Sequence, residues 1–441
     1  MDTAKIIALA DQYPNQELAD TRRDFHKYAE VAWTEFRTTS KIIEFLRARG
    51  IPVVFGLDVV NPEYTWSYPA PEAIELHKKR AVEQGADPQL VEQMQGYTGA
   101  MAIIDSGKPG PTIAIRVDID CNDMGEVQDE KHRPYKEGFS SVNSGFMHAC
   151  GHDGHATVGM YTAAVLWEAK DQLCGKVKII FQPSEEGDKG AQSLVERGLL
   201  DDVDVVISTH ITSDDGNPYP AVSGTSMGLY ATTKFDVEIT GKNAHAGAAP
   251  EQGNHAIMAA CMAIMSMNSF MQDGRGSSRL NIGTIQGGTG RNVIPNRCFF
   301  RAETRSSDTD AEQRLYNKAI ACVKAACDAF DCTYTTKIMG YGPAGDGDAD
   351  LAETIAEVAK SVPGIKHTQA LQYNTGGTDD FTYMMHKVRG QGGKTVYMRL
   401  HTQTAAGAHN DWYDFDESCL GPGVKSFVAV VCHLMEKGVS N

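Results

Sequence analysis

The sequence predicts an α/β protein in which a sheet flanked by helices is interrupted by a smaller α+β domain. Three observations lead to this fold class. Short apolar runs alternate with helical patterns up to about residue 228. Residues 229–340 then follow a β-α-β-β-α-β order, and helix and strand signals of the first kind resume over residues 341–441. We therefore expect one domain built from residues 1–228 and 341–441, with residues 229–340 inserted into it.

The opening part of the first domain is expected to be helical. Residues 17–49 show helical spacing and end at Gly50 and Pro52, two residues that stop helices. Residues 70–95 are charged and rich in alanine, which predicts one or two surface helices.

Strands begin to alternate with helices after this region, and several strands end in polar residues. Because a doubly wound sheet carries its chemistry at the carboxyl ends of its strands, we expect these polar side chains to meet there. They are Asp118 and Asp120, Glu185 and Glu186, and His210. The predicted strands cover residues 99–107, 110–120, 175–186 and 203–211, and the predicted helices cover residues 157–170 and 191–200.

The inserted domain is predicted from a change in periodicity. Residues 229–242 alternate like a half-exposed strand, as expected for a sheet with one covered face. The methionines of the helix predicted over residues 253–272 indicate core packing rather than a ligand site. The remaining predicted elements are strands over residues 278–288, 296–307 and 332–340 and a helix over residues 310–330.

Composition restricts the kind of partner. The chain of 441 residues has 41 Lys and Arg against 57 Asp and Glu, a formal net charge of −16. Nucleic acids and anionic membranes bind clustered positive charge, so this balance argues against both as partners. A small acidic substrate stays possible, because a few local arginines can bind a carboxylate.

The N-terminal segment, the lengths of the apolar runs and the cysteine pattern predict a cytoplasmic protein. The first residues, MDTAKIIALADQYPNQ, lack the basic and apolar segments of a signal peptide. No run approaches about eighteen apolar residues, so no transmembrane helix is expected. The ten cysteines are scattered and include no CxxC pair, which predicts free thiols in a reducing compartment.

The segment HACGHDGH, residues 148–155, is the first candidate for a metal site. Cys150 and His152 are two residues apart, so both side chains can lie on one side of a loop. Thiolate and imidazole bind Zn²⁺ and similar ions, and a carboxylate ligand widens the choice toward Mn²⁺. Glu186 and His210, at the ends of separate strands, are the candidates to complete the site. A polar surface loop would explain the segment without any metal.

The adjacent pair Glu185 and Glu186 predicts a division of roles. Neighbouring residues cannot both bind one ion without strain, so Glu186 is expected to bind metal and Glu185 to act as a general base. A solvated acidic turn is the alternative interpretation. No GxSxG motif is present to support a serine hydrolase. A cysteine hydrolase using Cys150 beside His148 or His152 stays open, although it would leave Glu185, Glu186 and His210 without roles.

Three weaker candidates lie in loops of small residues. His409 in AAGAHND is a possible metal ligand, although a lone histidine is usually structural. His245 in GKNAHAGAAP and Asn292 in GTGRNVIP belong to the inserted domain, and both residue types commonly bind carbonyl oxygens or oxyanions.

Taken together, these segments resemble the dinuclear-metal peptidases that include aminoacylases, hippurate hydrolases, glutamate carboxypeptidase and auxin-conjugate hydrolases. The resemblance covers nearly the whole chain. The motifs occur in the family's order: RRDFH…E…FRT, RVDID, HACGHDGH, FQPSEEG, GKNAHAGAAP, GRNVIP, AETR and AGAHND.

This resemblance implies a fold, an activity and a substrate class. The fold would be a zinc-peptidase-like mixed sheet flanked by helices, with an inserted ferredoxin-like domain that acts in dimerisation and as a lid. The activity would be metal-dependent hydrolysis of the amide in an N-acyl or N-aroyl amino acid, with p-aminobenzoyl-glutamate or a related acyl-glutamate or acyl-aspartate as the first choice. Indole-acetyl-aspartate, hippurate and N-acetyl amino acids are the alternative substrates, and a non-catalytic metal-binding subunit is the alternative role.

The resemblance also implies site residues and cofactors. Two divalent ions, Mn²⁺ or Zn²⁺, would be held with Glu185 as the base. Many family members have a His-x-Asp motif where this chain has Arg116, Val117 and Asp118, and Cys150 would take over the ligand role of the missing histidine. The implied metal ligands are Cys150, His152, Glu186, His210 and His409.

Further roles follow from the same resemblance. Asp118 and Asp153 would orient the ligands. His245 would reach into the active site of a dimer partner, where it would bind the carbonyl oxygen, while Asn292 and Arg305 would help to hold the substrate's carboxylate. The partner would be a second copy of this chain or a homologous subunit.

Overall fold

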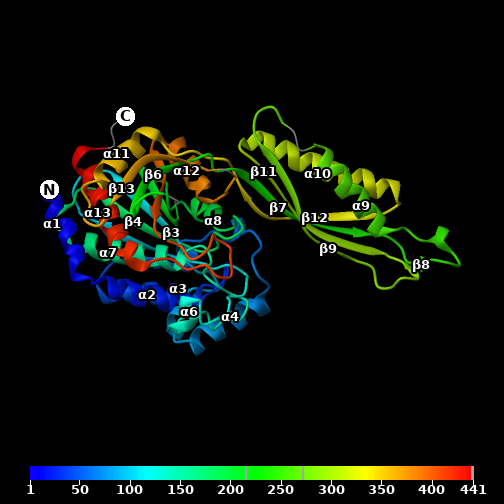
Figure 1. Cartoon of the computed structure of the whole chain (residues 1–441), viewed down its shortest axis with the longest axis horizontal. Helices are drawn as coiled ribbons and strands as arrows, with labels where there is room; N and C mark the ends of the chain where they lie inside the picture. The colour runs from blue at the N-terminus through cyan, green and yellow to red at the C-terminus, as the bar shows by residue number, and fades with distance from the viewer. Residues whose placement is uncertain (214–215, 271–272, 375, 439–441) are drawn as a thin grey trace.

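The computed structural model describes residues 1–213, 216–270, 273–374 and 376–438. Two large sheets organise these residues, one of eight strands and one of four. The eight-stranded sheet lies inside the main body of the molecule, and the four-stranded sheet projects from it with two helices (Figure 1). The predicted α/β class with a mixed sheet between helices is confirmed.

The main sheet has four parallel strands at its centre. Its order is β1-β2-β4-β3-β5-β14-β6-β13, in which β4, β3, β5 and β14 run parallel to one another. β2 pairs antiparallel with β4, and β6 pairs antiparallel with β14, so the sheet is mixed. The strands are β1 (Val53–Phe55), β2 (Ala100–Asp105), β3 (Thr112–Asp118), β4 (Lys176–Gln182), β5 (Val205–Thr212), β6 (Ala221–Met227), β13 (His367–Tyr373) and β14 (Lys394–His401).

Helices cover both faces of this sheet, which explains the continuous apolar runs of its central strands. In β3, Ile113 and Ile115 belong to one buried cluster and Ala114 to another, because successive side chains of a strand point to opposite faces. One face packs against α7 (His152–Glu168), α11 (Ala349–Ala359) and α13 (Leu420–Lys437), and the other packs against α8 (Ala191–Glu196) and α12 (Phe381–Gly390).

The helical stretch predicted over residues 17–49 is wrong in one respect, because it forms two helices. α2 (Asn15–Lys27) ends well before α3 (Phe36–Ala48) begins. The buried carboxylate of Glu30 accepts hydrogen bonds from the N–H groups of Arg37 and Thr38, at 3.1 and 2.8 Å, and so satisfies the free start of α3. Residues 70–95 form two helices as predicted, α4 (Pro71–Glu83) and α5 (Pro88–Gln93).

The inserted segment forms an antiparallel sheet of order β12-β7-β11-β9, with both of its helices packed on it. A short pair, β8 with β10, lies at the far end of this projection (Figure 1). Residues 271–272, the end of the predicted helix over 253–272, lie outside the described residues. The elements are β7 (Ala231–Thr240), β8 (Ala244–His245), α9 (Ala256–Met267), β9 (Ser278–Gly287), β10 (Val293–Ile294), β11 (Arg297–Ser306), α10 (Thr309–Ala329) and β12 (Thr333–Gly342).

Three of the four methionines of α9 correct the prediction of core packing, whereas Met267 is buried in the core as predicted. Met258, Met262 and Met265 are 47%, 43% and 76% exposed, so within one chain they do not pack in the core. They follow one another at helical spacing, and the opposite side of α9, with Ala259 and Ala263, is the side that packs on the sheet.

One helix of the described chain is long and apolar enough to cross a membrane by length and composition. It is α13 together with the turn that starts at Glu417. However, 72% of its most apolar window is buried inside the fold, where it packs against α7 and α11. Its apolar character is therefore that of a core helix.

Candidate metal centre and active site

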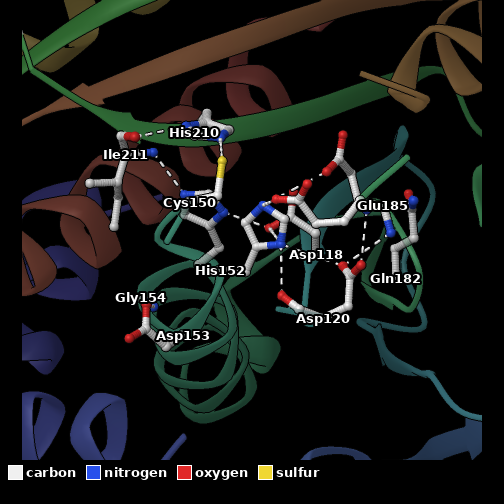
Figure 2. A network of polar contacts seen from close by, with 12 residues as sticks. Asp118, Asp120, Cys150, His152, Asp153, Gly154, Gln182, Glu185, His210 and Ile211 are labelled. Atoms are coloured by element: carbon white, nitrogen blue, oxygen red, sulfur yellow. Dashed lines mark hydrogen bonds and ion pairs between the residues drawn. The ribbon is translucent and has the colours of Figure 1, made fainter. Parts of the chain in front are cut away.

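The predicted metal ligands come together at the carboxyl edge of the main sheet. Cys150 Sγ lies 3.2 Å from His210 Nε2, and Figure 2 shows the two side chains facing each other. On the other side of the cluster, His409 Nε2 lies 3.4 Å from Glu186 Oε1, and His152 Nε2 lies 3.9 Å from the same oxygen. All five predicted ligands thus belong to one cluster.

Backbone geometry explains why Cys150 and His152 can both take part. Gly151 between them has φ +87°, a left-handed conformation that glycine adopts without strain. The turn leads directly into α7, so His152 is the first residue of that helix. Cys150 lies just before the N-terminus of this helix.

Hydrogen bonds to carbonyl groups orient two of the histidines. His152 Nδ1 donates to the carbonyl oxygen of Asp120 at 2.9 Å, and His210 Nδ1 donates to the carbonyl oxygen of Ile211 at 2.7 Å. A carbonyl can only accept, so in both rings Nδ1 carries a proton and Nε2 is the nitrogen that can bind a metal. Such partners are typical of metal-binding histidines.

The cluster fits a pair of divalent metal ions. Ligand atoms of Cys150, His152 and His210 lie within 4.8 Å of one another, and so do those of Cys150, Glu186 and His409. Within the described part of the chain, His152 Nε2 and Glu186 Oε1 are buried and have no hydrogen-bond partner. Buried polar atoms normally have partners, and a sulfur, imidazole and carboxylate set is suited to Zn²⁺ or Mn²⁺.

Two buried carboxylates for which no role was predicted hold the loop that carries the glutamate pair. Asp120 accepts the N–H groups of Glu185 and Glu186 at 3.0 and 2.9 Å. Glu35 accepts the N–H of Ser184 at 2.8 Å, and Ser184 has a left-handed φ of 58°. Asp120 ends the RVDID motif and Glu35 lies within RRDFH…E…FRT, so the motifs themselves contained the signal for both residues.

Neighbouring groups shift the pKa values of Glu185 and Glu186 in opposite directions. Burial raises the pKa of Glu185 well above its ordinary value, and the negative charges of Asp379 and Glu186 raise it further. Burial alone would also raise the pKa of Glu186, but the imidazole of His409, 3.4 Å away, and the charge of His152 lower it. Two carboxyl groups whose pKa values are driven apart are suited to separate acid–base roles.

The two aspartates predicted to orient the ligands have different surroundings. Asp118 accepts His155 Nδ1–H at 2.5 Å and lies 3.7 Å from His152 Nδ1. His155 Nε2 in turn accepts the N–H of Ile211 at 2.7 Å, next to His210 in β5. Asp118 therefore acts on the ligands indirectly.

Asp153 makes no hydrogen bond to a predicted ligand within the described part of the chain. Its carboxylate forms an ion pair with Arg22, whose Nε lies 2.7 Å away, and accepts a hydrogen bond from His26 Nδ1 at 2.8 Å. In Figure 2 its side chain points away from the ligand side chains. It fixes the first turn of α7 against α2.

A pocket of about 570 Å³ opens beside the cluster. Glu185 lines it from the main body, and Arg305 of β11 lines it from the inserted sheet. Arg305 donates to the carbonyl oxygen of Gly376 and to Glu303, both at 3.0 Å. This predicted substrate-binding residue is thus next to the ligand cluster of its own chain.

The other two predicted residues of the inserted domain lie elsewhere. His245 is exposed in β8, and Ala246 N–H donates to the carbonyl oxygen of Asn292 at 3.1 Å, so His245 and Asn292 are neighbours. Neither lines the pocket of its own chain. β8 lies at the end of the projection farthest from the main body (Figure 1).

Comparisons with known proteins agree with these features. A family model described as Peptidase family M20/M25/M40 matches residues 114–433. The chain is 38% identical to one subunit of the p-aminobenzoyl-glutamate hydrolase of Escherichia coli (strain K12), over 93% of this chain and 94% of the relative. It is also 38% identical to indole-3-acetyl-aspartic acid hydrolase of Enterobacter agglomerans, over 95% of this chain and 97% of the relative.

Solved structures share the fold. An aminobenzoyl-glutamate utilization protein from Klebsiella pneumoniae superimposes with a TM-score of 0.81 at 31% identity, covering 100% of both chains. A Bacillus subtilis protein described as a dinuclear metal binding peptidase has a TM-score of 0.65 at 24% identity, covering 96% of this chain and 98% of that one. The family expected from the motif order is confirmed, and this chain belongs to Peptidase family M20/M25/M40.

Proposed function

We propose that this chain is a metal-dependent amidohydrolase that cleaves the amide of an N-acyl or N-aroyl glutamate or aspartate, with p-aminobenzoyl-glutamate as the first substrate to test. The observation that carries the proposal is the convergence of five candidate ligand side chains beside a pocket that Glu185 lines. The names of the two 38%-identical relatives support the substrate class, and one of them makes indole-3-acetyl-aspartate the second candidate.

The metal-binding residues of the proposal form two sets that share Cys150. His210 and His152 complete one set, and Glu186 and His409 complete the other. Bound Mn²⁺ or Zn²⁺ ions would polarise the amide carbonyl and make hydroxide available at neutral pH.

The chain's own residues supply the proton transfers. Glu185 accepts a proton from the attacking water and passes it to the nitrogen of the leaving amino acid. Its raised pKa suits a group that must hold that proton between the two steps. Arg305 binds a carboxylate of the leaving amino acid from the inserted sheet.

A partner chain completes the proposed site. His245 and Asn292, which lie far from the pocket of their own chain, act in the pocket of the partner, where His245 binds the carbonyl oxygen. Residues 1–228 and 341–441 form the catalytic unit, and residues 229–340 form the dimerisation and lid unit. The exposed methionines of α9 support a contact between chains. The partner is a second copy or a homologous subunit, and the compartment is the cytoplasm.

Hydrolysis assays test the proposal. Metal-free protein is loaded with Mn²⁺ or Zn²⁺ and assayed with p-aminobenzoyl-glutamate, indole-3-acetyl-aspartate, hippurate and N-acetyl amino acids, with and without chelator. The two acidic conjugates should be hydrolysed fastest, and the chelator should abolish activity until metal is restored. Activity that survives complete chelation would instead favour Cys150 as a nucleophile.

Glu185→Gln tests the role of the base separately. We expect kcat to fall by about two to four orders of magnitude, because the variant cannot accept the proton from water. Its metal content should match that of the wild type, since Glu185 belongs to neither ligand set. A variant with full metal content and near-normal turnover would remove Glu185 from the mechanism.

A further inference from the structure

One cation in the active-site pocket has neither a role in the proposed function nor a carboxylate partner among the described residues. Lys234, Arg305 and Arg399 all line this pocket. Lys234 forms an ion pair with Asp188, and Arg305 donates to Glu303 at 3.0 Å. Over the residues that the structure describes, Arg399 has no ion pair with a carboxylate. Its charge is therefore available to an anion that enters the pocket.

The sheet fixes the position of Arg399 beside the ligand cluster. Arg399 of β14 pairs in register with His210 of β5, so the two side chains project from the same face of the sheet. Its Nε donates to Ser226 Oγ at 2.7 Å, and its guanidinium carbon lies 4.7 Å from the centroid of the Tyr397 ring. These contacts hold the side chain through Nε and leave both Nη groups to bind a ligand.

We infer that Arg399 binds the side-chain carboxylate of the amino acid in the substrate, and that this contact makes the enzyme prefer glutamyl and aspartyl amides to amides of neutral amino acids. The inference rests on the proposed function, in which Arg305 holds the other carboxylate. A glutamate has two carboxylates, and the pocket offers Arg399 from the main sheet and Arg305 from the inserted sheet. An arginine binds a carboxylate through two parallel N–H···O bonds, and a site built for such bonds rejects a neutral analogue.

A pair of substrates that differ in one charge tests this role. We expect Arg399→Gln to lower kcat/KM for p-aminobenzoyl-glutamate by about 10- to 100-fold, the usual effect of losing charge-assisted hydrogen bonds. The value for p-aminobenzoyl-glutamine should stay within about twofold of wild type, because that side chain has no charge to bind. For p-aminobenzoyl-glutamate, the kcat/KM of Arg399→Lys should lie between those of the wild type and Arg399→Gln. Lysine keeps the positive charge but cannot form two parallel N–H···O bonds.

Arg197→Gln is the matched control. Arg197 lies outside the pocket, its side chain is 45% exposed, and its ion-pair contact with Asp58 is long, at 3.9 Å. This variant removes the same charge and should match wild type on both substrates. If Arg399→Gln lowers kcat/KM equally for both substrates, or for neither, the inference is overturned. If Arg399→Gln does not fold, Arg399→Lys serves for the same comparison.

Binding of glutarate, a five-carbon dicarboxylate, to the metal-free protein gives a readout that does not need turnover. Calorimetry should show weaker binding in Arg399→Gln by about the factor seen in kinetics, and no change in Arg197→Gln. No glutarate binding to the wild type, or equal affinity in Arg399→Gln, contradicts the inference. Failure of the proposed function looks different, because metal-loaded wild type would then hydrolyse neither aminobenzoyl compound while glutarate binding still decides the role of Arg399.

Discussion

Among single residues, Asp120 contacts both the proposed base and the proposed ligands. Its carboxylate accepts the N–H groups of Glu185 and Glu186, and its backbone carbonyl accepts His152 Nδ1–H. One residue therefore sets the positions of the proposed base and of two proposed ligands. A displacement of such groups by about 1 Å is enough to slow a reaction strongly.

Asp120→Asn, compared with a control that loses the same charge, tests whether Asp120 positions Glu185 and Glu186. One of the two amides would face an NH₂ group instead of an oxygen, which should lower the free energy of unfolding by about 1–3 kcal/mol. We expect kcat to fall by about 100-fold, because the pair shifts relative to the substrate. Asp123→Asn, at an exposed position, is the control for the same charge change. Steady-state kinetics with wild-type kcat in Asp120→Asn would show that these amide contacts do not position the pair.

The sequence could predict the ligands because residue type and spacing carry that information. Cys150 and His152 are close along the chain, and Glu186 and His210 follow apolar strands. The position of Asp153 relative to the ligands could not be predicted, because its orientation depends on its contacts with α2. Arg399 was missed for a similar reason, since an arginine in a strand usually faces solvent and only strand register sets it beside His210.

At the scale of elements, a buried ion-pair network joins α2 to the turn before α13. Arg22 Nη1 donates to Asp414 Oδ1 at 3.0 Å. Glu417 accepts hydrogen bonds from Arg23 Nη2 at 2.7 Å and Arg133 Nη1 at 2.9 Å. Burial alone would raise the pKa of Glu417, but the hydrogen bond from Arg23 and the charges of Arg22 and Arg133 lower it.

This lowered pKa predicts how stability depends on pH. The unfolded value of a glutamate is about 4.3, so the stabilising contribution of Glu417 is fully present above that pH and is lost as the pH falls through the lower folded value. Glu417→Gln should reduce the free energy of unfolding by about 1–3 kcal/mol at pH 7, because it removes the charge that Arg22, Arg23 and Arg133 contact.

The difference in the free energy of unfolding between Glu417→Gln and the wild type should shrink as the pH falls below about 4, because the wild-type carboxyl also becomes neutral there. Denaturant unfolding of the metal-free proteins between about pH 7 and 3 measures this free-energy difference without a contribution from metal release. Glu353→Gln, at an exposed position of α11, should track the wild type throughout. If the free-energy difference between Glu417→Gln and the wild type is constant with pH, the network stabilises the fold through packing and not through charge.

Element types were more predictable than element boundaries. The periodicity of residues 229–340 predicted the order of the four long strands and two helices of the inserted sheet correctly. It could not show the break between α2 and α3, because that break depends on Glu30, a polar residue whose bonds to the start of α3 are made only in the folded chain.

At the scale of the whole molecule, the distance between the tip of the inserted sheet and the ligand cluster requires a partner if His245 is to act in catalysis. The fold class followed from the alternation of strands and helices. The order of the strands did not, because a period of two residues places side chains on faces and does not determine which strands become neighbours. β14 lies between β5 and β6, although a long stretch of chain separates it from both.

Complementation between two inactive variants tests the role of His245. His245→Ala and Glu185→Gln should each be nearly inactive, because each removes a different part of every site. After the two variants are unfolded together and refolded, mixed dimers should contain one complete site and restore about a quarter of wild-type activity. The unmixed variants treated in the same way are the controls. No recovery, with mixed dimers demonstrated by mass spectrometry, would show that His245 does not act in the partner's site.

The metal content of the loaded protein tests most directly whether Cys150, His152, Glu186, His210 and His409 hold two ions. Metal-free chains are loaded with Mn²⁺ or Zn²⁺, freed of excess by gel filtration and measured by elemental analysis. The structure leads us to expect about two ions per wild-type chain and about one in His210→Ala or His409→Ala, since each variant disrupts one ligand set. A wild-type chain that retains no ion, or variants that retain as many as the wild type, would contradict the proposed centre.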